Sequence, residues 1–230
     1  MKNIVLFGRD HRALAVREAL LAAGHNILWW YSVPDRDRDW EKALSASGRE
    51  ISLGVVANWP LKLRPEVLAI PKYGWINCHA GPVPTYRGGS PLNWQIINGE
   101  THMGLSLLQL DEGLDTGPVI SRTWFRLEKH QTIADAHILA NEWFGEAVAA
   151  CVTTLDRWPE SHQSIPQDAY SGLGEPRTWP QRNDDMGGID LSWPAEKVVN
   201  FVRALTHPYP GAWLKAHDGK RVRIWNASLR

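Results

Sequence analysis

An amide, an imidazole and a carboxylate stand at or beside the expected ends of strands. Asn77 and His79 flank Cys78, so in an extended chain both side chains point to the same face of a sheet. Asp115 lies in a glycine-bounded loop after another apolar run. An amide N–H can stabilise a developing oxyanion, an imidazole can carry a proton near neutral pH, and a carboxylate can orient the imidazole or accept a proton. The three side chains could therefore converge on one reacting carbon.

Each of these residues also fits a structural role. A histidine at the end of a strand is commonly a hydrogen-bonded structural residue, and an aspartate beside glycines is commonly a turn residue. No serine or cysteine nucleophile accompanies the set, and we expect Cys78 to point into the sheet. Residue type and spacing alone leave catalysis and structure both open.

The elements that must position these residues are short apolar strands alternating with helices. This alternation predicts an α/β fold with a mostly parallel, doubly wound sheet. Ligands bind such sheets beyond the C-terminal ends of the strands, so the segments after Cys78 and Leu110 are the places to look. We expect strands at 3–8, 26–30, 52–57, 75–78, 103–110 and 118–125, and helices at 12–23, 91–98 and 132–155.

Helix signals support two of these boundaries. Ser90 and Pro91 predict a capped helix start, and Gly99 a helix end. Thr132 and Asp135 are spaced as in a capping box.

The last third of the chain changes in composition. Residues 159–188 are rich in Pro, Gly, Gln, Ser and Asp, which predicts a loop or linker. An amphipathic helix is expected at 194–205, and a β-hairpin from Pro210 onward with Asp218 and Gly219 in its turn. We therefore expect a main domain over residues 1–185 and a short C-terminal helix and β-hairpin over residues 186–230.

Composition excludes several classes of protein. The chain has 230 residues, 43% of them hydrophobic. Its 25 basic and 25 acidic residues balance, which argues against a nucleic-acid partner because such proteins usually carry a basic excess. No apolar run is long enough for a membrane span, and no signal peptide is evident. Two cysteines, Cys78 and Cys151, make a disulfide scaffold or a cysteine zinc site improbable. We expect a cytoplasmic protein with no membrane, nucleic-acid or metal partner.

The first loop lacks a dinucleotide fingerprint. Gly8 is followed by Arg9, Asp10, His11 and Arg12, without the second and third glycines of G-x-G-x-x-G. Binding of NAD or FAD in the usual way is therefore not expected. Arg9 and Arg12 could hold a phosphate at the start of the first helix, or be solvated surface residues.

Three ordered motifs resemble the folate-dependent formyltransferases, a family that includes methionyl-tRNA, glycinamide ribonucleotide and sugar-nucleotide formyltransferases. They are N-x-H at Asn77–His79 with D-x-G-x-D-T-G at Asp111–Gly117, Y-R-G-x-x-P at Tyr86–Pro91, and the segment Phe201–Ala212. The resemblance runs over residues 50–215. Where the family commonly has H-P-S-L-L-P, this chain has His79–Pro84, H-A-G-P-V-P, which could alter a wall of the folate pocket.

The resemblance implies a Rossmann-like fold and transfer of a formyl group from N10-formyltetrahydrofolate to an amine. Asn77 and a donor form of His79 would stabilise the oxyanion and Asp115 would take the amine proton, although either of the last two could be the base. The implied folate neighbours are Trp59, Pro60, Leu61, Val83, Leu110, Asp111, Gly113 and Leu114. The candidate acceptor contacts are Arg9, Lys72, Tyr86, Arg87 and Gly88, of which Arg87 is favoured because it lies in the motif beside the histidine.

The acceptor is narrowed by the resemblance. Methionyl-tRNA formyltransferases carry a basic C-terminal barrel, whereas this chain ends soon after Gly211. We therefore expect a nucleotide-linked aminodeoxysugar of surface glycan or O-antigen synthesis, and a homodimer formed through the hairpin. The alternatives are an amino acid or hydroxylamine side chain, methionyl-tRNA, hydrolysis of the formyl donor, and a non-enzymatic folate-binding regulator.

Overall fold

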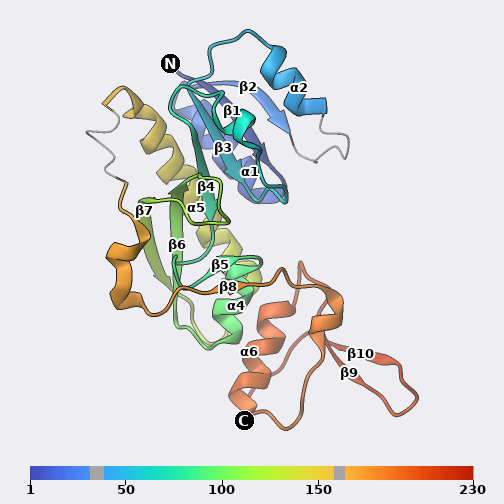
Figure 1. The fold of residues 1–230 in the computed structure, drawn as a ribbon. Helices are drawn as coiled ribbons and strands as arrows, with labels where there is room; N and C mark the ends of the chain where they lie inside the picture. Colours follow the sequence, from blue (N-terminus) through green and yellow to red (C-terminus); the bar gives the residue numbers. More distant parts are fainter. Residues whose placement is uncertain (32–38, 158–163, 230) are drawn as a thin grey trace.

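The computed structural model describes residues 1–31, 39–157 and 164–229, and its centre is a six-stranded sheet of order β2-β1-β3-β4-β6-β7 (Figure 1). The first four strands of this order are parallel, β6 runs antiparallel to β4, and β7 runs antiparallel to β6. The expected α/β fold with a mostly parallel sheet is confirmed. The strands are β1 (Asn3–Gly8), β2 (Asn26–Tyr31), β3 (Leu53–Ala57), β4 (Trp75–His79), β6 (His102–Gln109) and β7 (Val119–Arg126).

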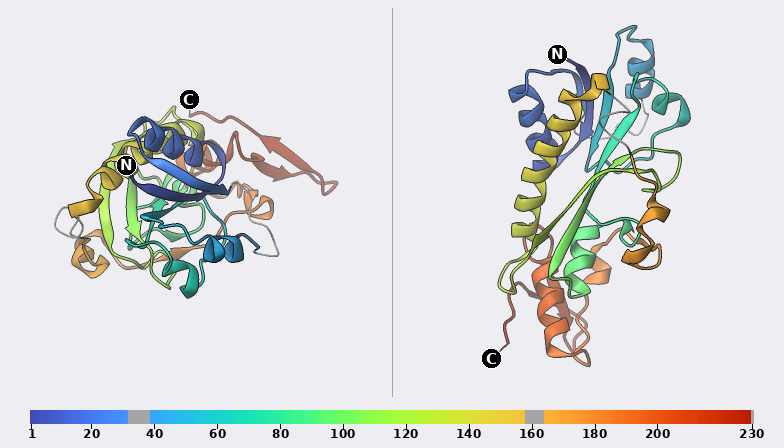
Figure 2. Two further views of the ribbon diagram at one scale, coloured as in Figure 1. Left: turned by 90° about the horizontal axis from the view of Figure 1, so that it is seen from above. Right: turned by 90° about the vertical axis from the view of Figure 1, so that its left-hand side faces the viewer.

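Helices cover both faces of this sheet. The helices α1 (Asp10–Ala22) and α5 (Ile133–Thr153) pack together on one face, and the shorter α2 (Asp39–Ala46) and α3 (Pro65–Leu68) lie on the other (Figure 2). Among the described residues no helix combines the length and apolar character that a bilayer crossing requires.

Strand alternation separates two hydrophobic clusters. In β4, Ile76 and Cys78 belong to the large core under α1 and α5, whereas Trp75 belongs to the cluster on the opposite face. Asn77 and His79 therefore share the face of Trp75. The inward direction expected for Cys78 is confirmed, and burial raises the pKa of its thiol to about 12.

The loop after β6 departs from the expected arrangement. Because β6 is antiparallel to β4, Ile76 pairs with Gln109 and the Leu110 N–H donates to the Trp75 carbonyl. Leu110 thus follows the C-terminal end of β6 but lies at the N-terminal end of β4, away from the edge where the parallel strands end. The loop reaches back across the sheet face, which brings Asp115 to the side chain of Asn77.

The two expected helix caps had different outcomes. The α5 capping box is confirmed: the Ala134 N–H donates to the Thr132 hydroxyl, and the Thr132 N–H to the Asp135 carboxylate. Ser90 does not cap α4 (Pro91–Ile97). Its backbone is left-handed, with φ of 49°, and its hydroxyl instead accepts from Gln181 and from the Arg182 N–H.

The segment expected to be a linker is joined to the sheet. Ile165 forms a β-bridge with Val119, and β8 (Thr178–Trp179) pairs with β5 (Arg87–Gly88). Short 3₁₀ helices at Leu155–Arg157, Gln167–Leu173 and Asp184–Gly187 complete the region. This part of the chain can therefore position residues of a site.

The C-terminal element follows the expected pattern. The helix α6 (Ala195–Leu205) packs on α4 and adds Phe201 and Leu205 to the core under α1 and α5. The strands β9 (Ala212–Lys215) and β10 (Arg221–Ile224) form the expected hairpin, which projects from the body of the molecule (Figure 1).

Candidate active site

Asn77, His79 and Asp115, here called the central cluster, meet on the sheet face that carries Trp75. The Asn77 Nδ2 donates to Asp115 Oδ1 at 3.1 Å, and His79 Nδ1 lies 3.4 Å from the same oxygen. His79 and Asp115 are 5% and 8% exposed. The three residues therefore form one contact network, in which His79 and Asp115 have little access to water and Asn77 is half-buried.

The position of the histidine proton follows from its neighbours. His79 Nε2 lies 2.6 Å from the Tyr86 carbonyl oxygen, and because a carbonyl only accepts, Nε2 must carry a hydrogen. Nδ1 therefore faces the Asp115 carboxylate. A neutral imidazole would place its lone pair against this carboxylate, so one further proton, on Nδ1 or on Asp115, makes the contact favourable. The pair is arranged to hold a proton.

The carboxylate of Asp115 is fixed by the chain around it. The Gly88 N–H donates to Asp115 Oδ2 at 2.8 Å, which occupies the second oxygen. Gly88 has φ of 88°, and a Cβ there would lie 2.3 Å from the Trp179 carbonyl oxygen. Only glycine fits this strand pairing, and its backbone orients Asp115.

Two further residues expected to contact the acceptor also support this network. Tyr86 is buried, its ring stacks on Trp179 with centroids 5.5 Å apart, and its hydroxyl donates to Glu100. Arg87 donates from Nε and Nη2 to the Oε1 of Gln167, at 2.9 and 2.7 Å. The contacts given for the Y-R-G motif are therefore with residues of the fold itself, and they support the central cluster.

The departure of this chain from the H-P-S-L-L-P pattern has a local explanation. A Cβ at Gly81 would lie 2.7 Å from the Tyr86 carbonyl oxygen and 2.8 Å from Pro91 Cβ. The Tyr86 carbonyl is the group that holds His79. In this chain a side chain at position 81 would displace that carbonyl or the start of α4.

Three of the eight residues expected near folate lie on the same face as the central cluster. Trp59, Leu61 and Leu110 are half-buried against one hydrophobic cluster, and Trp59 stacks on Phe7 with ring centroids 5.2 Å apart. Leu114 is 59% exposed. An apolar surface beside polar main-chain groups suits a flat heterocycle, so these residues fit a reduced pterin.

The other expected folate neighbours have different positions. Pro60 is exposed, and the Asp111 carboxylate accepts from the Gly113 N–H and from the Thr116 hydroxyl, which closes the loop. Val83 is fully buried in a separate cluster with Leu108 and Val119. Its side chain therefore does not join the surface around Trp59.

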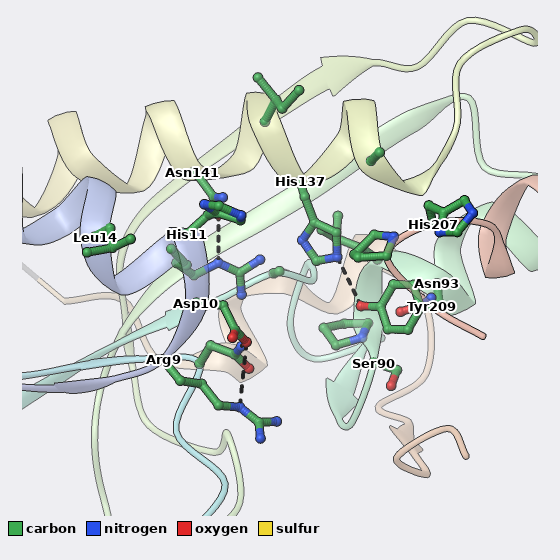
Figure 3. A pocket seen from close by; sticks show the side chains of 18 of the residues that line it. Arg9, Asp10, His11, Leu14, Ser90, Asn93, His137, Asn141, His207 and Tyr209 are labelled. Atoms are coloured by element: carbon green, nitrogen blue, oxygen red, sulfur yellow. Dashed lines mark hydrogen bonds and ion pairs between the residues drawn. The ribbon is translucent and has the colours of Figure 1, made fainter. Parts of the chain in front are cut away.

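A cavity of about 750 Å³ lies at the start of α1, where residues that follow β1, β3 and β4 meet α4 and α5 (Figure 3). None of the central cluster lines it, but Ala80, the neighbour of His79, and Asn58 do. We call it the α1 cavity. Its other lining residues are Arg9, Asp10, His11, Arg12, Leu14, Ser90, Pro91, Leu92, Asn93, Ala134, His137, Ile138, Asn141, Gln181, His207, Pro208 and Tyr209.

Cationic and imidazole groups gather in the α1 cavity. Arg12 donates from Nε to Asn141 Oδ1 at 3.3 Å and lies over the Phe144 ring, and no carboxylate of the described residues forms an ion pair with it. His137 contacts the Tyr209 hydroxyl at 2.9 Å (Figure 3). Desolvation, followed by the charges of Arg12 and His11, lowers the pKa of His137 to about 4. His137 is therefore neutral near pH 7, and Arg12 offers a positive charge to a cavity that the Asp10 carboxylate also lines.

The expected acceptor residues Arg9 and Lys72 lie far apart. Arg9 lines the α1 cavity, with its Nε 3.8 Å from the Asp10 carboxylate. Lys72 comes just before β4, its N–H donates to the Ile51 carbonyl, and its amine lies over Tyr73. Since β4 runs from Trp75 to His79, Lys72 lies at the opposite edge of the sheet, and the structure does not bring it to either site.

Gln167 is a residue of the site that sequence reasoning missed. It follows the expected linker composition, and nothing in its spacing marks it. It is 6% exposed, and it contacts both Arg87 and the Asp115 loop. The bridge of Ile165, two residues before it, to Val119 places it beside this loop. Among the described residues no group of three or more His, Cys, Asp or Glu side chains could hold a metal ion.

Comparison with known proteins gives matches along most of the chain. Residues 10–139 match the model of the formyl transferase family, and residues 183–230 match the model of the formyl transferase C-terminal domain. A methionyl-tRNA formyltransferase from Caldanaerobacter subterraneus subsp. tengcongensis is 33% identical over 215 residues, which cover 93% of this chain and 66% of that relative. The chain thus spans about two thirds of the length of such curated relatives.

Solved structures share the fold over nearly the whole chain. A sugar N-formyltransferase from a Shewanella species has a TM-score of 0.76 at 16% identity and covers 100% of this chain and 99% of its own. HypX from Aquifex aeolicus, in complex with tetrahydrofolic acid, has a TM-score of 0.77 at 23% identity and covers 98% of this chain and 37% of its own. By the match over residues 10–139 and the identity to the methionyl-tRNA enzyme, the chain belongs to the formyl transferase family, whose members are folate-dependent enzymes that transfer formyl groups.

Proposed function

We propose that this protein transfers a formyl group from N10-formyltetrahydrofolate to a primary amine. The observation that carries the proposal is the buried contact of Asn77 and His79 with one carboxylate, that of Asp115. Charge interactions in such a site are stronger than in bulk water. The reaction is also the type that the family carries out.

In this proposal the folate supplies the formyl carbon, and its nitrogen leaves with the proton that the amine loses. Asn77 has two amide N–H groups, one engaged by Asp115 and the second directed to the formyl oxygen as charge grows on it. Asp115 and His79 take the proton from the attacking amine and return it to the leaving nitrogen. Because Tyr86 engages Nε2 of His79, the proton moves at Nδ1.

This assignment differs from the expectation that His79 also donates to the oxyanion. Both ring nitrogens already have partners, Tyr86 and Asp115. We therefore assign oxyanion stabilisation to Asn77 and proton transfer to the pair of His79 and Asp115. The folate would lie on the apolar surface around Trp59 and Leu110, which is on the same face of the sheet.

We propose that the acceptor enters from the α1 cavity and carries a phosphate. Arg12 supports this, because a cation without a carboxylate partner among the described residues recruits an anionic ligand. Arg9 and the N-terminus of the 13-residue helix α1 add positive potential, which the Asp10 carboxylate in the first turn partly offsets. A cavity of about 750 Å³ has room for a nucleotide and a sugar, so a nucleotide-linked aminodeoxysugar is the acceptor we favour.

Methionyl-tRNA is the second candidate acceptor. It is favoured by the sequence identity, which is 33% to a methionyl-tRNA formyltransferase and 16% to the sugar N-formyltransferase from Shewanella. The balance of 25 basic and 25 acidic residues argues against it, because proteins that hold tRNA usually carry a basic excess.

Mass spectrometry of the products separates these candidates. The protein is incubated with N10-formyltetrahydrofolate and, in parallel, with UDP-, dTDP- and GDP-linked aminosugars, free aminosugars, amino acids and methionyl-tRNA. A gain of one formyl group on a nucleotide-linked aminosugar supports the proposal. Formylation of methionyl-tRNA alone overturns the sugar assignment, and release of formate without any acceptor product overturns transfer altogether.

A matched pair of variants tests the cavity. Arg12→Met should raise KM for a phosphate-bearing acceptor by ~10-fold or more with little change in KM for the folate, because it removes a charged contact. Arg17→Met changes the same residue type on the same helix outside the cavity lining and should leave both KM values unchanged. Equal effects of the two variants would place the acceptor elsewhere.

The homodimer remains a proposal of its own. Val222 and Trp225 are exposed on and beside the hairpin, and an apolar surface of this kind favours association. Light scattering of the protein and of Val222→Lys tests it, with a monomeric mass for the unmodified protein as the contrary result.

A further inference from the structure

Gln167 is a buried amide that uses its whole hydrogen-bonding capacity inside the site. Its Oε1 accepts from Nε and Nη2 of Arg87, at 2.9 and 2.7 Å. Its Nε2 donates to the carbonyl oxygens of Asp115 and Gly117, at 2.8 and 2.7 Å. An amide offers two N–H donors and one oxygen with two lone pairs, so all four positions are filled. Among side chains of this length, only the amide of glutamine combines two N–H donors with an acceptor oxygen.

The peptide units that Gln167 holds are those that set the direction of the Asp115 side chain. Asp115 has φ of 53°, in the left-handed region that residues other than glycine seldom adopt. A conformation of this kind persists only where the surroundings over-determine it. The bonds from Gln167 to the carbonyls of residues 115 and 117 restrain this backbone from one side. The Gly88 N–H restrains the carboxylate from the other.

Arg87 connects the two restraints. It precedes Gly88 in β5, and its guanidinium is bound by the same amide that holds the Asp115 loop. The short strand β5, the loop and the 3₁₀ helix at Gln167–Leu173 therefore meet at one side chain. A shift of Gln167 would move Gly88 and Asp115 relative to each other.

We propose that Gln167 is the positioning residue for the reaction, and that it acts by holding Asp115 in the geometry that lets it share a proton with His79. The inference rests on the proposed function, because it assigns Gln167 a role in formyl transfer. It does not place Gln167 in contact with substrate. The bonds to the two carbonyls carry the role, and the bonds from Arg87 anchor the amide.

Three substitutions distinguish the role of the amide oxygen, which binds Arg87, from that of the amide N–H groups, which bind the two carbonyls. Gln167→Glu keeps an oxygen for Arg87 and loses the donors to the carbonyls of residues 115 and 117. Gln167→Met keeps the approximate volume and loses both sets of bonds. Arg87→Met removes the anchor and leaves the donors of Gln167 in place. Asp168→Asn, on the exposed neighbouring residue, is the control and should change nothing.

Kinetics and a spectroscopic readout are measured together. Gln167→Glu and Gln167→Met should each lower kcat ~10²-fold with KM values unchanged within about twofold, since misplacement of a reacting group by about 1 Å has this effect. Arg87→Met should lower kcat less than either. The ¹⁵N chemical shifts of His79, assigned with His79→Gln, should show a changed protonation of Nδ1 in both Gln167 variants. Thermal unfolding confirms that each variant is folded.

Several results would overturn the proposal. Retained kcat in Gln167→Glu together with loss in Arg87→Met would show that the amide serves the arginine alone. A rise in KM at constant kcat would make Gln167 a binding residue, and unmoved His79 resonances would exclude coupling through Asp115. If the unmodified protein formylates no acceptor, the proposed function fails, while the His79 resonances still decide whether Gln167 positions the pair.

Discussion

Neutral His137 in the α1 cavity should make the folded protein sensitive to acid. Burial, the charge of Arg12 and that of His11 lower the pKa of His137 from 6.5 to about 4. The unfolded chain therefore binds a proton between pH 6.5 and 4 that the folded chain does not bind. Stability must rise with pH across this window, and the contribution is lost as pH falls below 6.5.

The size of this effect follows from the shift. A difference of one pKa unit corresponds to about 1.4 kcal/mol, so the full penalty from His137 is about 3 kcal/mol below pH 4. At pH 5 the histidine is almost fully protonated in the unfolded chain and almost neutral in the folded one. The loss of folding stability at this pH is therefore about 2 kcal/mol. This is a large fraction of the stability of a typical domain.

Urea unfolding of the unmodified protein and of His137→Gln at pH 7 and at pH 5 measures this contribution. At pH 7 the variant should be less stable by about 1 kcal/mol, because it weakens the contact with the Tyr209 hydroxyl. Between pH 7 and 5 it should lose about 2 kcal/mol less than the unmodified protein does. His217→Gln, which removes an exposed histidine from the hairpin turn, should leave the pH dependence unchanged. Parallel losses in His137→Gln and the unmodified protein, or an NMR titration of His137 near 6.5, would refute the reasoning.

Further changes test the cluster and its supports. Asp115→Asn should lower turnover ~10²–10⁴-fold in the formyl-transfer assay, because it removes a positioned proton acceptor. Thr132→Ala should cost about 1 kcal/mol in urea unfolding, because it removes the hydroxyl that caps α5. Gly117→Ala would place a Cβ 1.8 Å from the Gln109 carbonyl oxygen and should destabilise the protein by ~1–3 kcal/mol, measured against Gly172→Ala, where the added carbon meets nothing within 4 Å.

The regular parts of the fold could be predicted because local patterns determine them. Alternation in β4 turned Cys78 to the core and left Asn77 and His79 on the other face, and the spacing of Thr132 and Asp135 produced the expected cap. The motifs also identified the formyl transferase family. These features depend on neighbours in sequence, which a single chain displays directly.

What could not be predicted depends on contacts between distant segments. Ser90 has the residue type of a cap, yet its hydroxyl is taken by Gln181 and Arg182. Arg87 has the residue type of a phosphate ligand, yet Gln167, 80 residues away, binds it. The direction of β6, which decides where Leu110 lies, depends on its pairing with β4. No local pattern contains this information.

Backbone strain also supports the proposal that the acceptor binds in the α1 cavity. Asp10, Asn58, Ser90 and Asp115 are the residues other than glycine that have positive φ among the described parts of the chain. The first three line the α1 cavity, and the fourth belongs to the central cluster. Each such residue costs on the order of 1 kcal/mol, which selection for stability alone would remove. The cavity and the cluster approach each other at His79 and Ala80, which supports the proposal that the acceptor reaches the cluster from the cavity.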